Sequence, residues 1–327
     1  MSDERQATLF ELPAPKLAAA PPAAEHTELA RQLSRLVRLG TMSWSFPGWR
    51  GLVYAEDAPA GSLSALGLSA YGQHPLLRAV EIDRSYYEPL PADTLRAYAE
   101  QVPEDFRFLV KAHELCSVRR FPTHARYGRR GGELNACYLD ASYASDAVVG
   151  PVESALGDKL GALLFQFSPA REEDDAAAFA DQLAAFLSRL PAGVPYAVEL
   201  RQNGLLTPAY VQALAAHGAV HCHNAWSGMP PVLAQAKQVL PSARNPLIVR
   251  WLLAPGERYE DARDRFRPFD RITREDVPVR SAIARLVAKA AARGVPSLVL
   301  INNKAEGSAP ASAFRLAQAI VEAAAPE

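Results

Sequence analysis

The chain has 327 residues, of which 49% are hydrophobic and 22% are charged, a composition typical of a globular protein. Its 35 Lys and Arg residues and 36 Asp and Glu residues leave a net charge of −1, which excludes binding to nucleic acid or membranes through bulk charge alone. Three cysteines without metal-binding spacing and the lack of a long apolar run predict a cytoplasmic protein with reduced thiols and no membrane contact.

The first 36 residues differ in composition from the rest of the chain. Residues 12–26 are rich in Pro and Ala, so we expect residues 1–36 to form a flexible arm that ends in a short helix over Glu28–Leu36. The remaining residues, 37–327, are expected to form one barrel domain. Within the arm, Gln6, Leu9 and Phe10 belong to a QATLF segment, which is similar to the peptide that docks bacterial DNA-processing proteins on the sliding clamp.

Eight short runs of strand-forming residues follow, and segments with helical periodicity, such as Ala176–Leu190 and Pro208–His217, separate several of them. This alternation predicts an α/β fold with a parallel sheet, and eight units favour a single (β/α)8 TIM-type barrel. An open doubly wound sheet is the alternative, although no GxGxxG motif follows the first run. A last helix is expected over Ala311–Ala324. The predicted strands are Val37–Ser43, Leu77–Asp83, Phe106–Lys111, Gly161–Gln166, Tyr196–Arg201, Ala219–His223, Leu247–Trp251 and Ser297–Asn302.

Polar or ionisable side chains stand at or near the end of nearly every predicted strand. Period-two alternation places Glu81 and Asp83 on one face of the second strand, and Val80 and Ile82 on the other. In a barrel, the carboxyl ends of the strands open onto one mouth, where the active sites of this architecture lie. The residues expected at this mouth are Glu81, Asp83, Lys111, His113, Gln166, Glu199, Arg201, His221, His223, Arg250, Asn302 and Asn303.

Several ordered motifs also carry a resemblance to a known family. They read GTMSWSFPGWRGLVY at 40–54, VEIDRSYYEPLP at 80–91, FRFLVKAHE at 106–114, LLFQFSP at 163–169, AVELRQ at 197–202 and LINNKAEGSAPASA at 300–313. Together they resemble the YecE-like family, also called domain of unknown function 72, over residues 38–320. The resemblance implies a TIM-type barrel and no established reaction. This chain departs from the family pattern in having Asp83 in place of Asn and no His in the segment that begins at Arg250.

Glu81 and Glu199 form the leading catalytic pair, because two carboxylates at a barrel mouth suit general acid–base chemistry or metal ligation. The alternative is a structural network in which neighbouring arginines neutralise both carboxylates. Lys111 and His113 complete the catalytic candidates. A minor alternative role for Lys111 is that of a Schiff-base nucleophile.

A divalent metal is a second interpretation of the mouth. His221 and His223 share one face of the sixth strand, and together with His113, Glu81 and Glu199 their imidazoles would suit zinc or manganese. The competing interpretation places one of these histidines at the mouth and another at a loop. The seventh and eighth strands supply Arg and Asn in place of carboxylates, which argues against a multinuclear centre.

An anion pocket is a third interpretation. Arg201 and Arg250 offer the planar geometry that binds phosphate or carboxylate at two points, and Lys111 adds a point charge. Simple packing is the alternative for the aromatic residues among the candidates. The predicted substrate-binding residues are Trp44, Asp83, Tyr87, Gln166, Arg201, Arg250, Asn302 and Asn303.

The segment after the third strand is strongly basic. Residues 119–132 read RRFPTHARYGRRGG and contain five arginines and no acidic residue. Arginines interleaved with Phe121 and Tyr127 suit contact with a phosphate backbone, and a solvated surface is the alternative. The nucleic-acid interpretation rests on Arg119, Arg120, Arg126, Arg129 and Arg130.

These patterns favour an enzyme, namely a hydrolase, lyase or isomerase, that uses acid–base carboxylates on a polar anionic substrate such as a sugar phosphate or phosphoester. One alternative is a nucleic-acid-processing or repair-associated enzyme recruited through the QATLF segment. Another alternative is a barrel that binds its ligand without catalysis. Turnover separates the two enzymes from the binding protein.

Overall fold

Eight parallel strands close into a barrel in which each strand pairs with the next along the chain and the last pairs with the first. The structure is a computed structural model that describes residues 17–169, 175–243, 245–253 and 256–325. It confirms the predicted α/β barrel, and the strand ends differ from the predicted ends by at most two residues. The strands are β1 (Val37–Thr41), β2 (Leu77–Ile82), β3 (Arg107–Lys111), β4 (Leu160–Phe167), β5 (Tyr196–Leu200), β6 (Val220–Ala225), β7 (Leu247–Trp251) and β8 (Ser297–Ile301).

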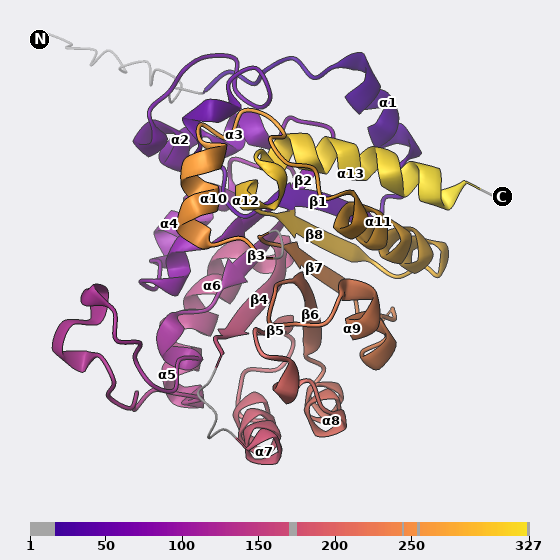
Figure 1. The fold of residues 1–327 in the computed structure, drawn as a ribbon. Helices are drawn as coiled ribbons and strands as arrows, with labels where there is room; N and C mark the ends of the chain where they lie inside the picture. Colours follow the sequence, from indigo (N-terminus) through magenta and orange to yellow (C-terminus); the bar gives the residue numbers. More distant parts are fainter. Residues whose placement is uncertain (1–16, 170–174, 244, 254–255, 326–327) are drawn as a thin grey trace, which may run out of the picture.

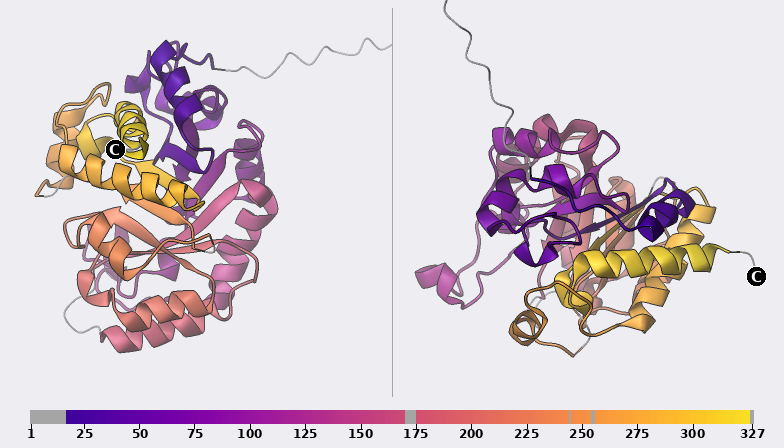
Figure 2. Two further views of the ribbon diagram at one scale, coloured as in Figure 1. Left: turned by 90° about the vertical axis from the view of Figure 1, so that its right-hand side faces the viewer. Right: turned by 90° about the horizontal axis from the view of Figure 1, so that it is seen from above.

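Helices surround the barrel and cover its outer surface (Figures 1 and 2). Within the described part of the chain, none is long and apolar enough to cross a membrane. The α-helices are α1 (Ala24–Gln32), α2 (Ala60–Leu66), α3 (Leu68–Tyr71), α4 (Ala92–Ala99), α5 (Ala141–Ala144), α6 (Gly150–Leu156), α7 (Ala176–Leu187), α8 (Pro208–Ala216), α9 (Val232–Gln238), α10 (Tyr259–Phe266), α11 (Val277–Ala292), α12 (Asn303–Glu306) and α13 (Ala309–Ala324).

The strands separate two hydrophobic cores. Side chains such as Val80 and Ile82 of β2 join the large core under the helices, whereas Ala79 belongs to a smaller core inside the barrel. Small residues inside the barrel let the strands pack closely. At Gly40 of β1, a Cβ atom would lie 1.9 Å from the carbonyl oxygen of Ala79, so only glycine fits this position. Because apolar side chains fill the interior, polar chemistry is confined to the mouth at the carboxyl ends of the strands.

Residues 17–36 of the predicted arm pack against the barrel. For residues 17–36 the expectation of a flexible arm is wrong: the backbone N–H of Ala20 donates to Val53, and His26 of α1 packs on Phe314 of α13 with ring centroids 4.0 Å apart. Helix α1 begins and ends four residues before the predicted helix over Glu28–Leu36. Leu29, Ala30 and Leu33 pack against the large core, which outweighs the Pro and Ala bias of the preceding residues. The QATLF residues Gln6, Leu9 and Phe10 lie outside the described residues.

Candidate active site

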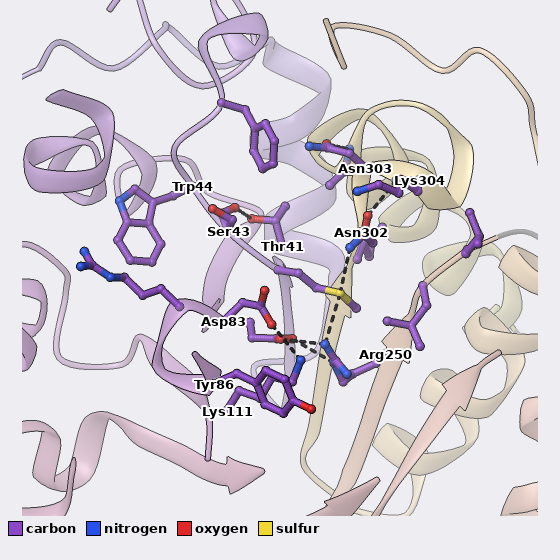
Figure 3. Close-up of a pocket in the computed structure, with 18 of the residues that line it drawn as sticks. Thr41, Ser43, Trp44, Asp83, Tyr86, Lys111, Arg250, Asn302, Asn303 and Lys304 are labelled. Atoms are coloured by element: carbon purple, nitrogen blue, oxygen red, sulfur yellow. Dashed lines mark hydrogen bonds and ion pairs between the residues drawn. The ribbon is translucent and has the colours of Figure 1, made fainter. Parts of the chain in front are cut away.

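A cavity of about 690 Å³ opens at the carboxyl ends of the strands (Figure 3). This volume lies in the range of small-molecule binding sites. The lining combines apolar walls with charged groups that converge from β2, β3, β7 and the segments after β2, β5 and β8. The predicted mouth residues that line the cavity are Trp44, Glu81, Asp83, Tyr87, Lys111, Gln166, Arg201, Arg250, Asn302 and Asn303.

Arg250 of β7 holds the floor of this cavity together. Its guanidinium donates to both carboxylate oxygens of Glu81, at 2.9 and 2.7 Å, and also donates to Glu199 Oε2. Arg250 is 3% exposed and both carboxylates are 0% exposed, so the three charges lie outside bulk water. One buried arginine between two buried glutamates stays in place because its charges and hydrogen bonds are mutually satisfied.

Further polar groups complete this network, which we call the floor: Glu81, Gln166, Glu199, Arg201, Asn224 and Arg250. Arg201 Nε lies 2.8 Å from Glu199 Oε1, and its guanidinium donates to Gln166 Oε1 at 3.0 Å. Asn224 Nδ2 donates to Glu199 Oε1 at 3.0 Å. Both oxygens of Glu199 are therefore occupied, and Glu199 does not line the cavity. The predicted acid–base role of Glu199 does not fit this position, which suits a group that orients the two arginines.

The two glutamates of the floor differ in their pKa. Burial raises the pKa of Glu81 to about 7, and the attraction of Arg250 does not offset this effect. Burial acts on Glu199 in the same direction, but Arg201 and Arg250 together outweigh it and hold the pKa of Glu199 below its ordinary value of 4.5. Near neutral pH, Glu199 is ionised, whereas Glu81 is present in both its protonated and its ionised form. Carboxyl groups whose pKa values are driven apart are typical of acid–base sites.

Asp83 and Lys111 form a second group, which we call the wall pair. Lys111 Nζ donates to Asp83 Oδ1 at 3.0 Å and lies 3.9 Å from the ring centroid of Tyr86. The side chain of Asp83 is 40% exposed, whereas that of Lys111 is 9% exposed. Burial opposes ionisation of Asp83, but Lys111 and Arg250 outweigh it, so the pKa of Asp83 is lowered. An ionised, accessible carboxylate therefore faces the cavity beside an ammonium group.

Two cations at the cavity, Arg84 and Lys304, are not among the predicted site residues. Lys304 of α12 lies 4.1 Å from the ring centroid of Tyr259, and the guanidinium of Arg84 donates to the hydroxyl of Tyr98. Neither cation has a carboxylate partner within ion-pair distance in the part of the chain that the structure describes. Figure 3 places Lys304 beside Asn303, away from Asp83 and Lys111. Lys304 follows directly on the predicted Asn302 and Asn303, so the end of β8 carried the signal.

The two asparagines after β8 shape the backbone around Lys304. Asn302 Oδ1 accepts from the backbone N–H of Lys304 at 2.9 Å and caps α12. Asn303 Oδ1 accepts from the indole of Trp49 at 3.3 Å and from the backbone N–H of Ala309 at 2.8 Å. These amide oxygens are thus used within the protein. The amide nitrogen of Asn302 also donates within the protein, to Met42 Sδ at 3.5 Å, and contact of the two asparagines with a substrate stays a prediction.

The aromatic candidates take two different positions. Trp44 is 4% exposed and packs edge-on against Tyr98, with ring centroids 5.0 Å apart, although one edge reaches the cavity. Tyr87 is 55% exposed and lies at the rim, where the guanidinium of Arg126 stacks 4.6 Å from its ring centroid. Trp44 therefore shapes the cavity from within the core, and the ring of Tyr87 is exposed at the cavity rim.

His113 does not belong to the mouth, contrary to the prediction. It follows β3 by two residues, but its Nδ1 pairs with the hydroxyl of Tyr143, outside the cavity lining. Burial lowers the pKa of His113, so the imidazole is neutral near pH 7. The alternation that placed Lys111 and His113 on one face ends with β3 at Lys111, because the chain turns into a short 3-10 helix at Glu114.

His221 and His223 share a face of β6 as predicted, but that face points into the helix layer and away from the mouth. His221 Nδ1 pairs with the hydroxyl of Tyr210 at 2.8 Å and its Nε2 pairs with Gln235, while His223 Nε2 pairs with the carbonyl of Val239. Burial lowers the pKa of His221 to about 3 and that of His223 to about 4. The metal site proposed for these histidines with Glu81 and Glu199 is therefore not formed.

Asn224, and not the histidines, is the polar side chain of β6 that joins the floor. It stands one residue further along the strand, so it points inward to Glu199. Gln235 of α9 fixes its backbone by accepting from the N–H of Asn224 and donating to its carbonyl. Among the described residues, no cluster of three or more His, Cys, Asp or Glu side chains has the arrangement of a metal site. Arg250 lies between the two floor carboxylates and pairs with both of them.

Comparison with known proteins supports the same architecture. Residues 38–327 match the family described as protein of unknown function DUF72, and no curated protein matches the chain significantly. A DUF72 family protein from Enterococcus faecalis V583 is 18% identical, with a TM-score of 0.54 over 88% of this chain and 95% of that chain. A DUF72 family protein from Thermotoga maritima MSB8 is 17% identical, with a TM-score of 0.54 over 86% and 98% of the two chains.

At this level of identity, the two solved structures establish a shared fold and no shared activity. The family match, in contrast, covers the barrel from the second residue of β1 onward. It confirms the resemblance drawn from the ordered motifs of the sequence. The chain therefore belongs to DUF72, a protein family of unknown function, and folds as a closed eight-stranded α/β barrel.

Proposed function

We propose that the chain is an enzyme that binds a phosphoryl-bearing substrate in the barrel mouth and moves a proton at that substrate through Asp83 and Lys111. The observation that carries this proposal is a surplus of positive charge at the cavity. Each of the three carboxylates at or beneath the cavity surface already pairs with a lysine or arginine. Arg84 and Lys304 remain without a carboxylate partner in the described part of the chain.

The charge of a phosphate monoester matches this surplus. A phosphate monoester carries a charge of about −1.5 to −2 at pH 7, which two cations balance. Lys304 follows β8 and Arg84 follows β2, and both strands pair with β1, so the two cations flank one sector of the mouth. The segment after the last strand is a frequent phosphate site in barrels of this type. A neutral sugar would leave both charges unbalanced.

The wall pair supports acid–base chemistry. Asp83 is the most exposed of the three carboxylates, and its lowered pKa keeps it ionised near neutral pH. It is placed to accept a proton from a substrate hydroxyl or an attacking water. Lys111 is placed to stabilise the negative charge that develops on the substrate oxygen. Glu81 lies behind this pair with its oxygens held by Arg250, so it acts as a positioning residue.

A ligand-binding barrel without catalysis is the second candidate. The saturated floor favours it, because every charged group there is already neutralised by another protein group. The two candidates share the anion site formed by Arg84 and Lys304. They differ in what Asp83 does.

Calorimetric titration with inorganic phosphate tests the anion site. We expect binding to the wild-type protein and at least a tenfold loss of affinity in Lys304→Met, because a charged contact contributes about 1.5–3 kcal/mol. The matched control is Lys289→Met, which removes a lysine from the exposed surface of α11. Equal affinity in wild type and Lys304→Met would refute the anion site.

A screen of phosphate monoesters and diesters then separates the enzyme from the binding protein. If the chain is an enzyme, Asp83→Asn should lower turnover by about 10²- to 10⁴-fold while phosphate affinity is kept. Phosphate affinity without turnover on any monoester or diester would instead support the binding protein.

A further inference from the structure

The segment between β3 and α5 projects from the barrel beside the mouth and is held by its own hydrogen bonds. We call residues 119–133 the arginine loop. Two backbone hydrogen bonds close its base, from Phe121 to the carbonyl of Glu133 and from Gly132 to the carbonyl of Phe121. Its tip contains a short 3-10 helix over Ala125–Arg130. Figure 1 shows this stretch standing away from the barrel, at the side opposite to α11.

The loop concentrates positive charge on a chain whose net charge is −1. All five of its arginines are exposed, and no acidic residue occurs before Glu133. The side chain of Arg129 makes no hydrogen bond, ion pair or ring contact with another described residue. Arg130 stacks on Phe121, 4.0 Å from the ring centroid, which holds its guanidinium against an aromatic face. Such a surface favours a ligand with many negative charges.

Arg126 connects the loop to the cavity. Its guanidinium lies 4.6 Å from the ring centroids of both Tyr87 and Tyr127, and it also pairs with Glu114. Tyr87 is 55% exposed and lines the cavity, and so does Tyr259, which is 54% exposed. The basic loop and the aromatic rim of the anion site therefore form one continuous surface.

We infer that this surface binds single-stranded nucleic acid, with the phosphate backbone along the arginine loop and a terminal phosphate-bearing nucleotide in the cavity. This inference rests on the proposed function of the mouth and names its substrate class. Single strands are bound by basic grooves that carry exposed aromatic rings, because each base stacks on a ring. A cavity of about 690 Å³ accepts one nucleotide and excludes a duplex.

Charge complementarity alone would also fit an acidic peptide. The exposed rings of Tyr87 and Tyr259 favour nucleic acid, because both line the cavity as surfaces on which a base can stack and an acidic peptide has no base to stack on them. We therefore treat acidic peptide and duplex DNA as competitors in the test.

Fluorescence anisotropy with a labelled 12-nucleotide single strand that carries a 5′ phosphate tests the inference. Arg129→Ala/Arg130→Ala removes two loop arginines. Arg285→Ala/Arg293→Ala, on and just after α11, removes two exposed arginines at the opposite side and gives the same net charge. We expect at least a tenfold loss of affinity in the loop variant and less than a twofold loss in the control. Equal losses in both variants would overturn the inference.

The salt dependence gives a second readout. Each phosphate contact with a single strand contributes about 0.7 to the slope of the logarithm of the binding constant against the logarithm of salt concentration. We expect the slope to fall by about 0.7 in Arg129→Ala, whose side chain makes no contact that its removal would disturb. An unchanged slope together with unchanged affinity in Arg129→Ala would contradict backbone contact at this loop.

Competition and phosphate binding separate the remaining outcomes. Duplex DNA of the same length or poly-glutamate that displaces the single strand at equal concentration would overturn the inference in favour of that partner. Inorganic phosphate should bind the loop variant as it binds wild type. In one outcome, the loop variant loses binding of the single-stranded nucleic acid and phosphate does not bind at Lys304. This outcome would refute the proposed function but not the nucleic-acid-binding surface at the arginine loop. Phosphate binding without loop-dependent strand binding would refute the inference alone.

Discussion

The wall pair lines the cavity and the floor closes it from beneath, and the two groups differ in how far their charges are satisfied. In the floor, Arg250 links Glu81 and Glu199, and both carboxylates are fully buried. In the wall, Asp83 has one ion-pair partner and keeps 40% of its side chain exposed. The wall therefore retains lone pairs that a substrate can use, whereas the floor has already used its own.

This difference separates structural charge from reactive charge. Buried ion pairs have lost their hydration and depend on one another, so removing one member leaves the others unpaired. A partly exposed pair can exchange its protein partner for a ligand at small cost. We therefore expect mutations of the floor to act mainly on stability and mutations of the wall to act mainly on turnover.

The largest effect is expected for Arg250→Met. This change leaves Glu81 and Glu199 buried without their shared partner and should lower the free energy of unfolding by about 3–5 kcal/mol, as measured by denaturant titration. Arg271→Ala serves as the control, because its side chain is 76% exposed and its ion pair contributes little. A loss below about 1 kcal/mol in Arg250→Met would contradict the coupled floor.

The next effect concerns Asp83→Asn. It should lower turnover of the phosphoester identified in the screen by about 10²- to 10⁴-fold, because it removes the proton acceptor. Its cost to the free energy of unfolding should be only about 1–2 kcal/mol, because the amide oxygen of asparagine can still accept from Lys111 but no longer carries the charge that pairs with it. If Asp83→Asn lost as much stability as Arg250→Met and kept its turnover, the proposed difference between the wall pair and the floor would be contradicted.

A pH series sharpens the comparison within the floor. The pKa of Glu81 is raised from 4.5 to about 7, so between these values the folded protein binds a proton that the unfolded chain has lost. Its contribution to stability is therefore complete below pH 4.5 and declines as the pH rises to about 7. Glu81→Gln should lack this decline, so the free energy of unfolding of wild type relative to the variant should fall across this window.

Glu199→Gln is the matched control for that series. The pKa of Glu199 is lowered, so its contribution is present above pH 4.5 and is lost as the pH falls through the folded pKa. The difference between wild type and Glu199→Gln should therefore stay constant between pH 4.5 and 7. Parallel curves for wild type and Glu81→Gln in this window would contradict the raised pKa.

The smallest effect is expected at the rim. Tyr259→Leu removes the ring that lies against Lys304 and should weaken phosphate binding about two- to fivefold, because cation–π contacts contribute about 0.5–1 kcal/mol. Tyr87→Leu is the control, since its ring contacts Arg126 and is equally exposed. Titration calorimetry should show unchanged phosphate affinity in Tyr87→Leu.

The sequence predicts the barrel and much of its mouth because period-two alternation is strict in the strands. Glu81 faces the interior and Val80 faces the helices, as alternation requires, and the same rule places Arg250 and Gln166 at the mouth. Alternation fails where a strand ends. His113 lies beyond the end of β3, so its position depends on the following turn.

The phase of β6 explains the remaining error. Alternation groups His221 with His223 but does not say which face is inside, and both faces of this strand carry polar residues. Tyr210 and Gln235 of the helix layer are the hydrogen-bond partners of His221. The residue pattern within the strand does not indicate partners from other elements. Asn224 is not predicted as a site residue, because it follows the predicted end of the strand at His223 and its residue type is typical of a loop.

The shared use of Arg250 has a consequence for how this sequence can diverge. A substitution at position 250 alone leaves two buried carboxylates without their shared arginine. A substitution at Glu81 or Glu199 alone leaves Arg250 with one of its two carboxylate partners. The three positions, on β2, β5 and β7, are therefore expected to change together or stay together among relatives. Where they have changed together, the replacement should be apolar in all three strands, and the mouth above it should have been rebuilt for a different ligand.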